Sequence, residues 1–590
     1  MSDNIPTPKE LEKEIGEFLA QKFGNNVKIV SAGIFPEEAL TEPNEQERKV
    51  TKKKKKINFN LKPAELISYL DRYIIKQDNA KAILATKICT HFNRIRLLES
   101  SNGNNNEMVG GIKNNVLMVG PTGAGKTYMV KLIAKKIGVP FVKGDATKFS
   151  ETGYVGGDVE DLVRDLVREA NDNLELAQYG IIYIDEIDKI ASSGHLIGAD
   201  ISRTGVQRAL LKPMEDTDID LKVPHDPISV MQDLEHYRKT GKRNKRVINT
   251  KNILFIMSGA FADIAPIIKK RVAKQEIGFG ANITSLKEND QFLQFLKAED
   301  LVSFGFESEF VGRLPVKAVF DKLKEEDLYE ILKNPNNPII LGKKLDFSAY
   351  GIDIKFDDEA LRLIAKDAYS ENTGARGLIS AIEKVLLLFE KRLPSTQVKK
   401  LPVTRFIIEN QEQALKELEG LIPPSNNLYE IFEELLNKEK EFVKDYIAKN
   451  INNLTEKFSI NLTPNRINII TEFYLKNIMD IESVIRKIKP NYEEAKKIEL
   501  YFFNDNNINI VFEDDALDFI VEERLNSSVS IDSIYKKILS DFELGLKLVR
   551  EKTGKTRFFI DKEALLSPEE YLENLIKSEM KHLVEDLEED

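Results

Sequence analysis

The segment GPTGAGKT, residues 120 to 127, constrains the fold of this chain more than any other feature. It follows the apolar run NVLMV and precedes Met129, Leu132 and Ile133, which recur at helical spacing. Strand, glycine-rich loop, Lys-Thr and helix, in that order, form a phosphate-binding loop, in which backbone N–H groups converge on phosphate oxygens at a helix N-terminus. A glycine turn that binds nothing is disfavoured, because the full motif occurs in its required context.

The loop residues are the expected contacts with ATP and Mg²⁺. Lys126 is expected to reach the β- and γ-phosphates, and Thr127 is expected to bind Mg²⁺. The other expected contacts with the nucleotide are Gly120, Pro121, Thr122, Gly123, Ala124, Gly125 and Tyr128. The sequence therefore predicts ATP and Mg²⁺ as cofactors.

The run IIYIDEIDKI, residues 181 to 190, supplies a second part of an ATP site. An apolar strand that ends in two acids places them at the mouth of a sheet, beside the phosphate loop. Asp185 is expected to hold Mg²⁺, usually through water, and Glu186 to polarise the attacking water as a general base. The predicted reaction is hydrolysis rather than transfer to another substrate.

Short runs rich in Val and Ile alternate with amphipathic helical stretches from about residue 61 onward. This alternation predicts an α/β fold, a P-loop ATPase domain whose mostly parallel sheet has helices on both faces. A helical small domain and an extra α-rich C-terminal domain are expected to follow. The expected parts are an N-terminal segment with a basic linker at 1–57, the large ATPase domain at 58–320, the small domain at 321–422 and a C-terminal extension at 423–590.

The C-terminal half contains an internal repeat. IDIKFDDEAL (352–361) recurs as INIVFEDDAL (508–517), VLLLFEKRL (385–393) as ILSDFELGL (538–546), and TRFIIEN (404–410) as TRFFIDK (556–562). Three matches in the same order predict a duplicated small domain, with a degenerate second copy at about 508–575. No second phosphate loop accompanies it, so we expect a non-catalytic module that serves packing or docking.

Composition excludes several other classes of protein. The net charge of −10 gives no global basic field, so nucleic acid is not an expected partner. Cys89 is the single cysteine, which rules out a disulfide framework and a cysteine-rich zinc site, and the five histidines show no metal-ligand spacing. We therefore expect no zinc. Because no signal pattern and no apolar stretch of about 18 residues occurs, the expected location is the cytoplasm, without a membrane partner.

From about residue 61 to 400 the chain resembles the ClpX family of AAA+ unfoldases, and more distantly the HslU family. The motifs occur in the order of the family through more than half of the protein. They are LISYLDRYIIKQDNAK on the adenine side, GYVGGDVEDLVRDL in the pore-loop stretch, DISRTGVQRALLKPME after the acidic motif, ESEFVGRLP around the arginine finger, and ENTGARGL at sensor two.

The resemblance implies a homo-hexameric ring and assigns further roles to its residues. Ile74 and Ile75 are expected against the adenine, and Ser258 at the sensor-one position is expected to respond to the γ-phosphate. Arg313 would enter the nucleotide site of the neighbouring subunit as an arginine finger, and Arg376 would contact the phosphates of its own subunit. Together with Lys126 and Glu186, these two arginines complete the expected catalytic set.

Two further motifs concern the protein partners that the family handles. Tyr154 and Val155 lie between glycines, and by resemblance they grip unfolded or tagged polypeptide in the pore of the ring. Ile277, Gly278 and Phe279 correspond to the loop that docks on a ClpP-type peptidase. The implied function is an ATP-dependent unfoldase and translocase that feeds a separate peptidase.

The chain also departs from the family pattern, which leaves alternatives open. Because Cys89 is the single cysteine, we do not expect the zinc-binding N-terminal domain of the family. Lys76 and Thr204 replace a glycine and a glutamate, and the segment 222–249 lacks the usual Arg-Lys-His triplet. One alternative is a stand-alone protein-remodelling chaperone that works without a peptidase. A nucleic-acid translocase on the same core is disfavoured, because Tyr154 and Val155 would make an apolar grip where phosphates call for lysines.

Overall fold

The computed structural model describes residues 59–100, 113–149, 157–191, 201–221, 247–276, 292–423, 427–527 and 530–588. The chain divides into two compact units. The first unit comprises Met1–Pro63, Ile83–Val119 and Val130–Val319, and the second comprises Ala64–Ala82, Gly120–Met129 and Phe320–Asp590. The phosphate-loop segment therefore groups with the C-terminal half of the chain, whereas the domain boundaries expected from the sequence stay a prediction.

A five-stranded parallel sheet forms the centre of the first unit, in the order β2-β3-β6-β1-β7. The strands are β1 (Val116–Val119), β2 (Phe141–Asp145), β3 (Ile181–Asp185), β6 (Leu254–Gly259) and β7 (Val316–Val319). Every residue of β1 and β6 is buried, as the apolar runs of the sequence predict for strands covered on both faces. The edge strand β7 alternates buried and partly buried residues, and this weaker pattern was not recognised in the sequence.

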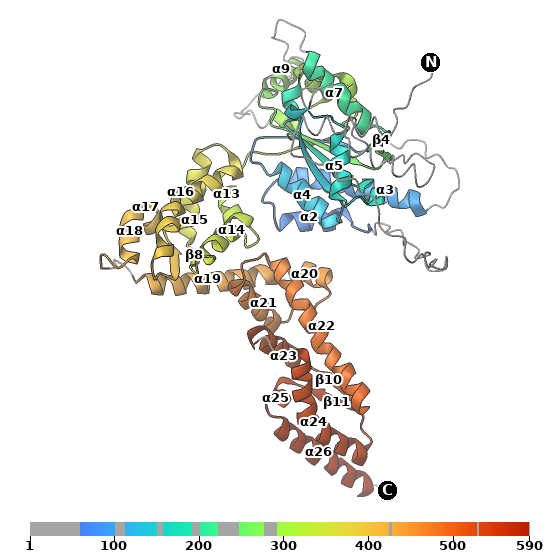
Figure 1. Ribbon diagram of the computed structural model, residues 1–590, viewed down its shortest axis with the longest axis vertical. Coiled ribbons are helices and arrows are strands. Elements are labelled where there is room, and N and C mark those ends of the chain that lie inside the picture. The colour runs from blue at the N-terminus through green and yellow to red at the C-terminus, as the bar shows by residue number, and fades with distance from the viewer. Residues whose placement is uncertain are drawn as a thin grey trace, which may run out of the picture. The chain divides into compact units, whose positions relative to one another are not determined.

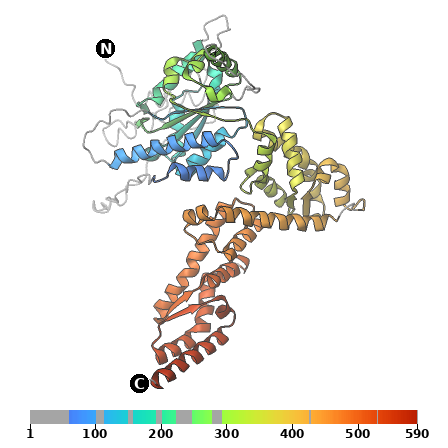
Figure 2. The same cartoon turned by 180° about the vertical axis from the view of Figure 1, so that it is seen from behind.

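Helices cover both faces of this sheet, as Figures 1 and 2 show from opposite sides. The helices of this part of the chain are α3 (Asp78–Ser100), α4 (Lys126–Ile137), α5 (Asp161–Glu169), α6 (Leu174–Ala177), α7 (Ile201–Met214), α9 (Ala265–Glu276), α11 (Ala298–Phe304) and α12 (Ser308–Gly312). The apolar side chains of α5, α7 and α9 pack with the sheet in one buried cluster, while α3 and α4 lie on its other side (Figure 1). A short antiparallel pair, β4 (Asp218–Asp220) and β5 (Val247–Asn249), completes the unit. The parallel α/β fold predicted from the sequence is thereby confirmed.

The second unit contains two copies of one arrangement of elements, as the sequence repeat predicts. In the first copy, the parallel strands β8 (Asp353–Phe356) and β9 (Lys400–Val403) are joined through α15 (Asp358–Ser370) and α16 (Gly377–Arg392). In the second copy, β10 (Asn509–Phe512) and β11 (Arg557–Ile560) are joined through α23 (Asp514–Ser527) and α24 (Ile531–Thr553). Two of the three pairs of matching sequence segments thus occupy matching elements, as expected of a duplicated domain, whereas TRFIIEN lies in a helix at Arg405–Glu409 and TRFFIDK lies in strand β11.

Further helices flank these two copies. In the first half of the unit they are α2 (Pro63–Asp71), α13 (Glu325–Lys333), α14 (Pro338–Ser348), α17 (Arg405–Glu409) and α18 (Gln411–Leu418). In the C-terminal extension they are α19 (Leu428–Lys449), α20 (Ile451–Phe458), α21 (Pro464–Lys476), α22 (Ile481–Asn506), α25 (Lys562–Leu566) and α26 (Pro568–Glu588). None of the helices within the described ranges combines the length and apolar character that a membrane span requires.

Candidate active site

The phosphate loop has a backbone that only glycine adopts readily. Gly123 and Gly125 have φ angles of 75° and 93°, in the left-handed region that carries a steric cost for residues with a Cβ atom. A Cβ atom on Gly123 would lie 2.1 Å from the main-chain oxygen of Thr373, so that position also lacks room for a side chain. The loop is therefore a concave stretch of backbone, which suits the close approach of phosphate oxygens.

Lys126 is the first residue of α4, so its ammonium group lies where the helix N-terminus adds positive potential. Its side chain is almost fully buried, and Nζ donates hydrogen bonds to the main-chain oxygens of Gly120 at 2.6 Å and Pro121 at 2.9 Å. The ammonium group thus lies inside the curve of the loop. This combination of glycine backbone, helix N-terminus and lysine fits a triphosphate.

A cavity of about 170 Å³ adjoins the loop within the same unit. Ile74, Ile75 and Tyr128, which the sequence assigns to nucleotide binding, all line it. Its other lining residues are Tyr73, Gly123, Ala124, Gly125, Leu323, Ile331, Asn334, Asn337, Pro338, Ile339 and Ala375. A mainly apolar wall with two amides suits a flat heteroaromatic base, which needs apolar contact and a few hydrogen bonds.

The sensor-two segment is joined directly to the phosphate loop. The backbone N–H of Ala375 donates a hydrogen bond to the oxygen of Gly123 at 3.0 Å. A Cβ atom on Gly374 would lie 2.8 Å from the oxygen of Thr122, so the two backbones are in close contact. Arg376 follows at the end of a short 3₁₀ turn and is exposed. Its predicted contact with the phosphates stays a prediction.

The acidic motif lies at the carboxyl end of β3, in the first unit. Asp185 accepts hydrogen bonds from Lys143 Nζ and from Ser258 Oγ, each at 2.9 Å, and Ser258 accepts one from Tyr183 Oη at 2.7 Å. Burial alone would raise the pKa of Asp185, but the hydrogen bonds from Lys143 and Ser258 outweigh it and hold the pKa below its usual value. A carboxyl group that stays ionised and is held by two donors fits a ligand of Mg²⁺.

Glu186 directly follows the strand and has a φ angle of 56°, which is uncommon for a residue with a side chain. Such strained residues concentrate at functional sites, and the side chain of Glu186 is exposed. Sequence reasoning placed Asp185, Glu186 and Ser258 but missed Lys143 and Tyr183. The only signal for Lys143 was a lysine inside the strand PFVKGD, which gives no hint of its partner.

Arg313 lies just after α12 and forms an ion pair with Glu215, which follows α7. Both side chains remain partly exposed. Nearby, Lys113 donates hydrogen bonds to the main-chain oxygens of Glu215 and Thr250, each at 2.7 Å. Burial lowers the pKa of Lys113 to about 7, and the charge of Arg313 acts in the same direction. Within one chain, the predicted finger is therefore held by a carboxylate of its own unit.

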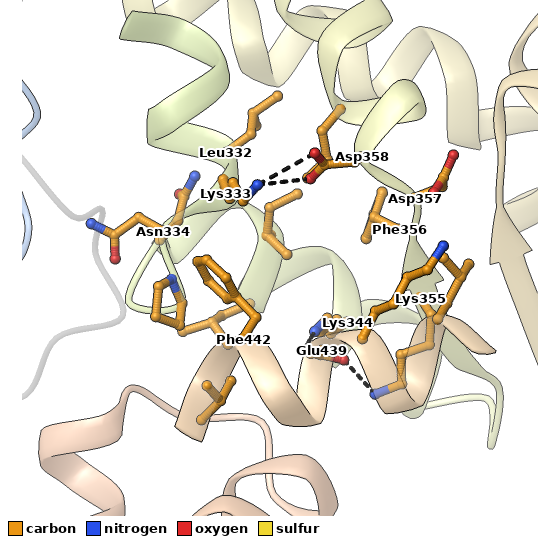
Figure 3. Close-up of a pocket in the computed structure, with 18 of the residues that line it drawn as sticks. Leu332, Lys333, Asn334, Lys344, Lys355, Phe356, Asp357, Asp358, Glu439 and Phe442 are labelled. Atoms are coloured by element: carbon orange, nitrogen blue, oxygen red, sulfur yellow. Dashed lines mark hydrogen bonds and ion pairs between the residues drawn. The ribbon is translucent and has the colours of Figure 1, made fainter. Parts of the chain in front are cut away.

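A larger cavity of about 440 Å³ lies where α13 and α14 meet α19 (Figure 3). Five of the charged side chains that line it form ion pairs with one another. Lys333 pairs with Asp358 at 3.1 Å, and Glu439 pairs with Lys344 and, at 2.9 Å, with Lys355. Because these charges are paired and no residue of the phosphate loop lines this cavity, its larger size does not make it the better candidate for the nucleotide. The smaller cavity, which Gly123 and Gly125 of the loop line, is the better candidate for the nucleotide site.

Thr127, the predicted ligand of Mg²⁺, is the second residue of α4 and is partly buried. Five other predicted site residues lie outside the described residues. These are Tyr154 and Val155 of the pore loop, and Ile277, Gly278 and Phe279 of the peptidase loop. Among the residues that the structure describes, no group of three or more His, Cys, Asp or Glu side chains is arranged to hold a metal ion.

Comparison with known proteins identifies the family. The family model of the AAA domain (Cdc48 subfamily) matches residues 112–317, and that of the C-terminal, D2-small domain, of ClpB protein matches residues 323–391. The ATP-dependent Clp protease ATP-binding subunit ClpX of Borrelia duttonii is 42% identical over 353 residues, which are 59% of this chain and 78% of that protein. The subunit of the same name from Borrelia recurrentis gives the same values, and that from Treponema denticola is 39% identical over 359 residues, 60% of this chain and 83% of its own. The chain therefore belongs to the ClpX family of AAA+ ATPases.

Proposed function

We propose that this ATPase is a homo-hexameric protein unfoldase and translocase that feeds unfolded or tagged polypeptides to a separate ClpP-type peptidase. The observation that carries the proposal is the backbone hydrogen bond between Ala375 and Gly123, 3.0 Å long. It joins the small-domain motif to the phosphate loop, so a change at the nucleotide is passed to the small domain without an intervening flexible link. An ATPase that moves polypeptide needs such a coupling.

The proposed roles of the site residues follow from their chemistry. ATP supplies the phosphoryl group to be cleaved, and a bound Mg²⁺ would supply charge neutralisation. Lys126 would bind the phosphates, and Thr127 and Asp185 would hold the metal ion. Glu186 takes a proton from the attacking water. Arg313, from a neighbouring subunit, and Arg376, from the same subunit, stabilise the charge that develops on the phosphates.

The proposal keeps the domain division expected from the sequence. Residues 58–320 form the large ATPase domain and 321–422 the small domain, so rotation between them would drive the pore loop. Residues 423–590 form an extension that carries the second copy of the small domain. No zinc is required by any of these parts.

Replacing Tyr154 with Ala should abolish unfolding of a stable substrate and leave ATP hydrolysis within about threefold of the wild type. The aromatic ring is proposed to contact polypeptide and not nucleotide. Its removal should therefore impair substrate unfolding and leave ATP hydrolysis largely unchanged. The two activities are measured in parallel, by phosphate release and by loss of fluorescence from a folded reporter protein. If both activities fell together, Tyr154 would have a structural role instead.

Replacing Phe279 with Ala should abolish binding of a ClpP-type peptidase and preserve ATPase and unfolding. Each buried Phe side chain contributes about 2 kcal/mol, and six loops on one ring reinforce one another through effective concentration. Co-sedimentation with the peptidase and degradation of a tagged substrate measure the effect. A wild-type protein that unfolds substrates but never binds the peptidase would favour the stand-alone remodelling chaperone.

A further inference from the structure

The segment just before the predicted adenine contacts is held by the C-terminal extension. Ile74 and Ile75 line the 170 Å³ cavity. Arg72, two residues earlier, forms an ion pair with Glu482 on the first turn of α22, and 2.7 Å separates Nη1 from Oε1. Only 7% and 3% of the two side chains are exposed. One short segment therefore contacts both the proposed nucleotide site and the extension.

Helix α20 adds further contacts to the same segment. Lys457 donates a hydrogen bond to Glu482, and its Nζ lies 5.0 Å from the centre of the Tyr69 ring. Asn453 donates a hydrogen bond to Ser68 Oγ at 2.9 Å. The carboxylate of Glu482 thus joins a cation of α20 to a cation of the segment that leads to the cavity.

A second connection runs through the loop between α13 and α14. Asn334 lines the cavity, and its Nδ2 donates to the main-chain oxygen of Arg72 at 2.8 Å. In the same loop, Asn336 accepts a hydrogen bond from the backbone N–H of Ile481 at 3.1 Å and donates one to Tyr446 Oη at 2.8 Å. The start of α22 is therefore tied to two stretches of backbone that form the wall of the cavity.

The charges of α22 also act on the cavity wall. Burial raises the pKa of Tyr128, a lining residue, to about 12, and the carboxylate of Asp480 acts in the same direction. Asp480 is the N-cap of α22 and accepts a hydrogen bond from Ser483 N at 3.0 Å. The first turn of this helix is thus both fixed in place and close enough to influence the lining.

We propose that Glu482 is a positioning residue for nucleotide binding, through which the C-terminal extension sets the affinity of the ATP site. The inference rests on the proposed function only in taking the 170 Å³ cavity as the place of the adenine. Glu482 is not among the residues that line the cavity, and it acts by neutralising Arg72 and Lys457. Without its charge, the buried guanidinium of Arg72 and the partly buried ammonium of Lys457 would lose their shared anion, and the segment would move to rehydrate Arg72.

The test compares Glu482→Gln with Glu494→Gln in the full-length chain. Glu494 lies on the same helix and pairs with Arg524 of α23, so its loss removes an ion pair that does not involve the segment of Arg72. Binding of a fluorescent ATP analogue gives Kd, and steady-state hydrolysis gives KM and kcat. Glu482→Gln should raise Kd and KM by about tenfold and leave kcat within about twofold, because coupling energies between sites are of that size. Glu494→Gln should change none of these values.

Circular dichroism at the assay temperature shows whether each variant is folded. If Glu482→Gln is unfolded, Glu482→Asp keeps the charge on a shorter side chain and should raise Kd by about threefold. An unchanged Kd in a folded Glu482 variant would overturn this inference and leave the proposed ATP site untouched. An equal rise of Kd in Glu494→Gln would have the same consequence. A wild-type chain that does not bind the analogue would instead overturn the proposed ATP site, and with it this inference.

Discussion

Replacing Glu186 with Gln should lower ATP hydrolysis by about a hundredfold or more and leave ATP binding intact. The amide keeps the size of the side chain but cannot take a proton from the attacking water, and general base catalysis contributes roughly 10² to 10⁴ in rate. Glu186 directly follows β3 and is next to Asp185, whose own carboxyl group has a lowered pKa and stays ionised. Phosphate release and binding of a fluorescent ATP analogue measure the two properties separately.

The matched control is Glu175→Gln, because Glu175 is an exposed carboxylate on α6 in the same unit. It should hydrolyse ATP at the wild-type rate. Wild-type turnover by Glu186→Gln would remove Glu186 from the catalytic set and leave hydrolysis without an identified base. Loss of binding together with hydrolysis would instead indicate that the substitution disturbs the strained backbone at this position.

The parts of the site that the sequence predicted share one property. Each is a motif of residues that are adjacent in the sequence, so it can be recognised without the rest of the fold. Examples are the glycines of the phosphate loop and the two acids at the end of β3. The fold class was predictable for the same reason, since buried parallel strands are short runs of Val and Ile between turn residues. Such local patterns can be recognised in the sequence without knowing which residues contact them in the folded protein.

The contacts that the sequence did not reveal join residues far apart in the chain. Lys143 meets Asp185 only because β2 and β3 pair in parallel with Asp145 opposite Asp185. Arg72 meets Glu482 only because an extension folds back on the adenine-side segment. Neither lysine nor arginine carries a local signal of its partner, because charged side chains are common on solvated surfaces. Strand register and tertiary packing determine which charged residues form such ion pairs. A single sequence contains no local pattern from which these pairs can be predicted.

The internal repeat was also predicted only in part. The matching segments predicted a duplicated small domain, and the parallel pairs β8–β9 and β10–β11 show the same strand arrangement in both copies. The matching segments did not indicate that helices preceding the second copy would pack near the nucleotide cavity. We therefore propose that this extension influences the ATP site through its position and charge, although it carries no catalytic motif.

Replacing Arg313 with Ala should reduce hydrolysis by about a thousandfold, because an arginine finger stabilises the charge that develops as the γ-phosphate leaves. The backbone should stay in place, since Asn115 donates a hydrogen bond to the main-chain oxygen of Arg313 at 3.2 Å whatever the side chain. In the isolated chain Arg313 is paired with Glu215 and would have to leave it to act on a neighbour. Glu215→Gln, which weakens that pair, should therefore hydrolyse ATP at least as fast as the wild type.

Mixing Arg313→Ala with Lys126→Ala subunits separates a finger that acts in trans from one that acts in its own subunit. Each variant alone lacks one half of every site, so each should be inactive. In mixed rings, a site with an intact Lys126 can face a neighbour with an intact Arg313, and part of the hydrolysis should return. Sedimentation establishes that both variants assemble. Assembly without any recovery of hydrolysis would mean that Arg313 serves its own subunit, and the ring would then lose its proposed route for coupling one nucleotide site to the next.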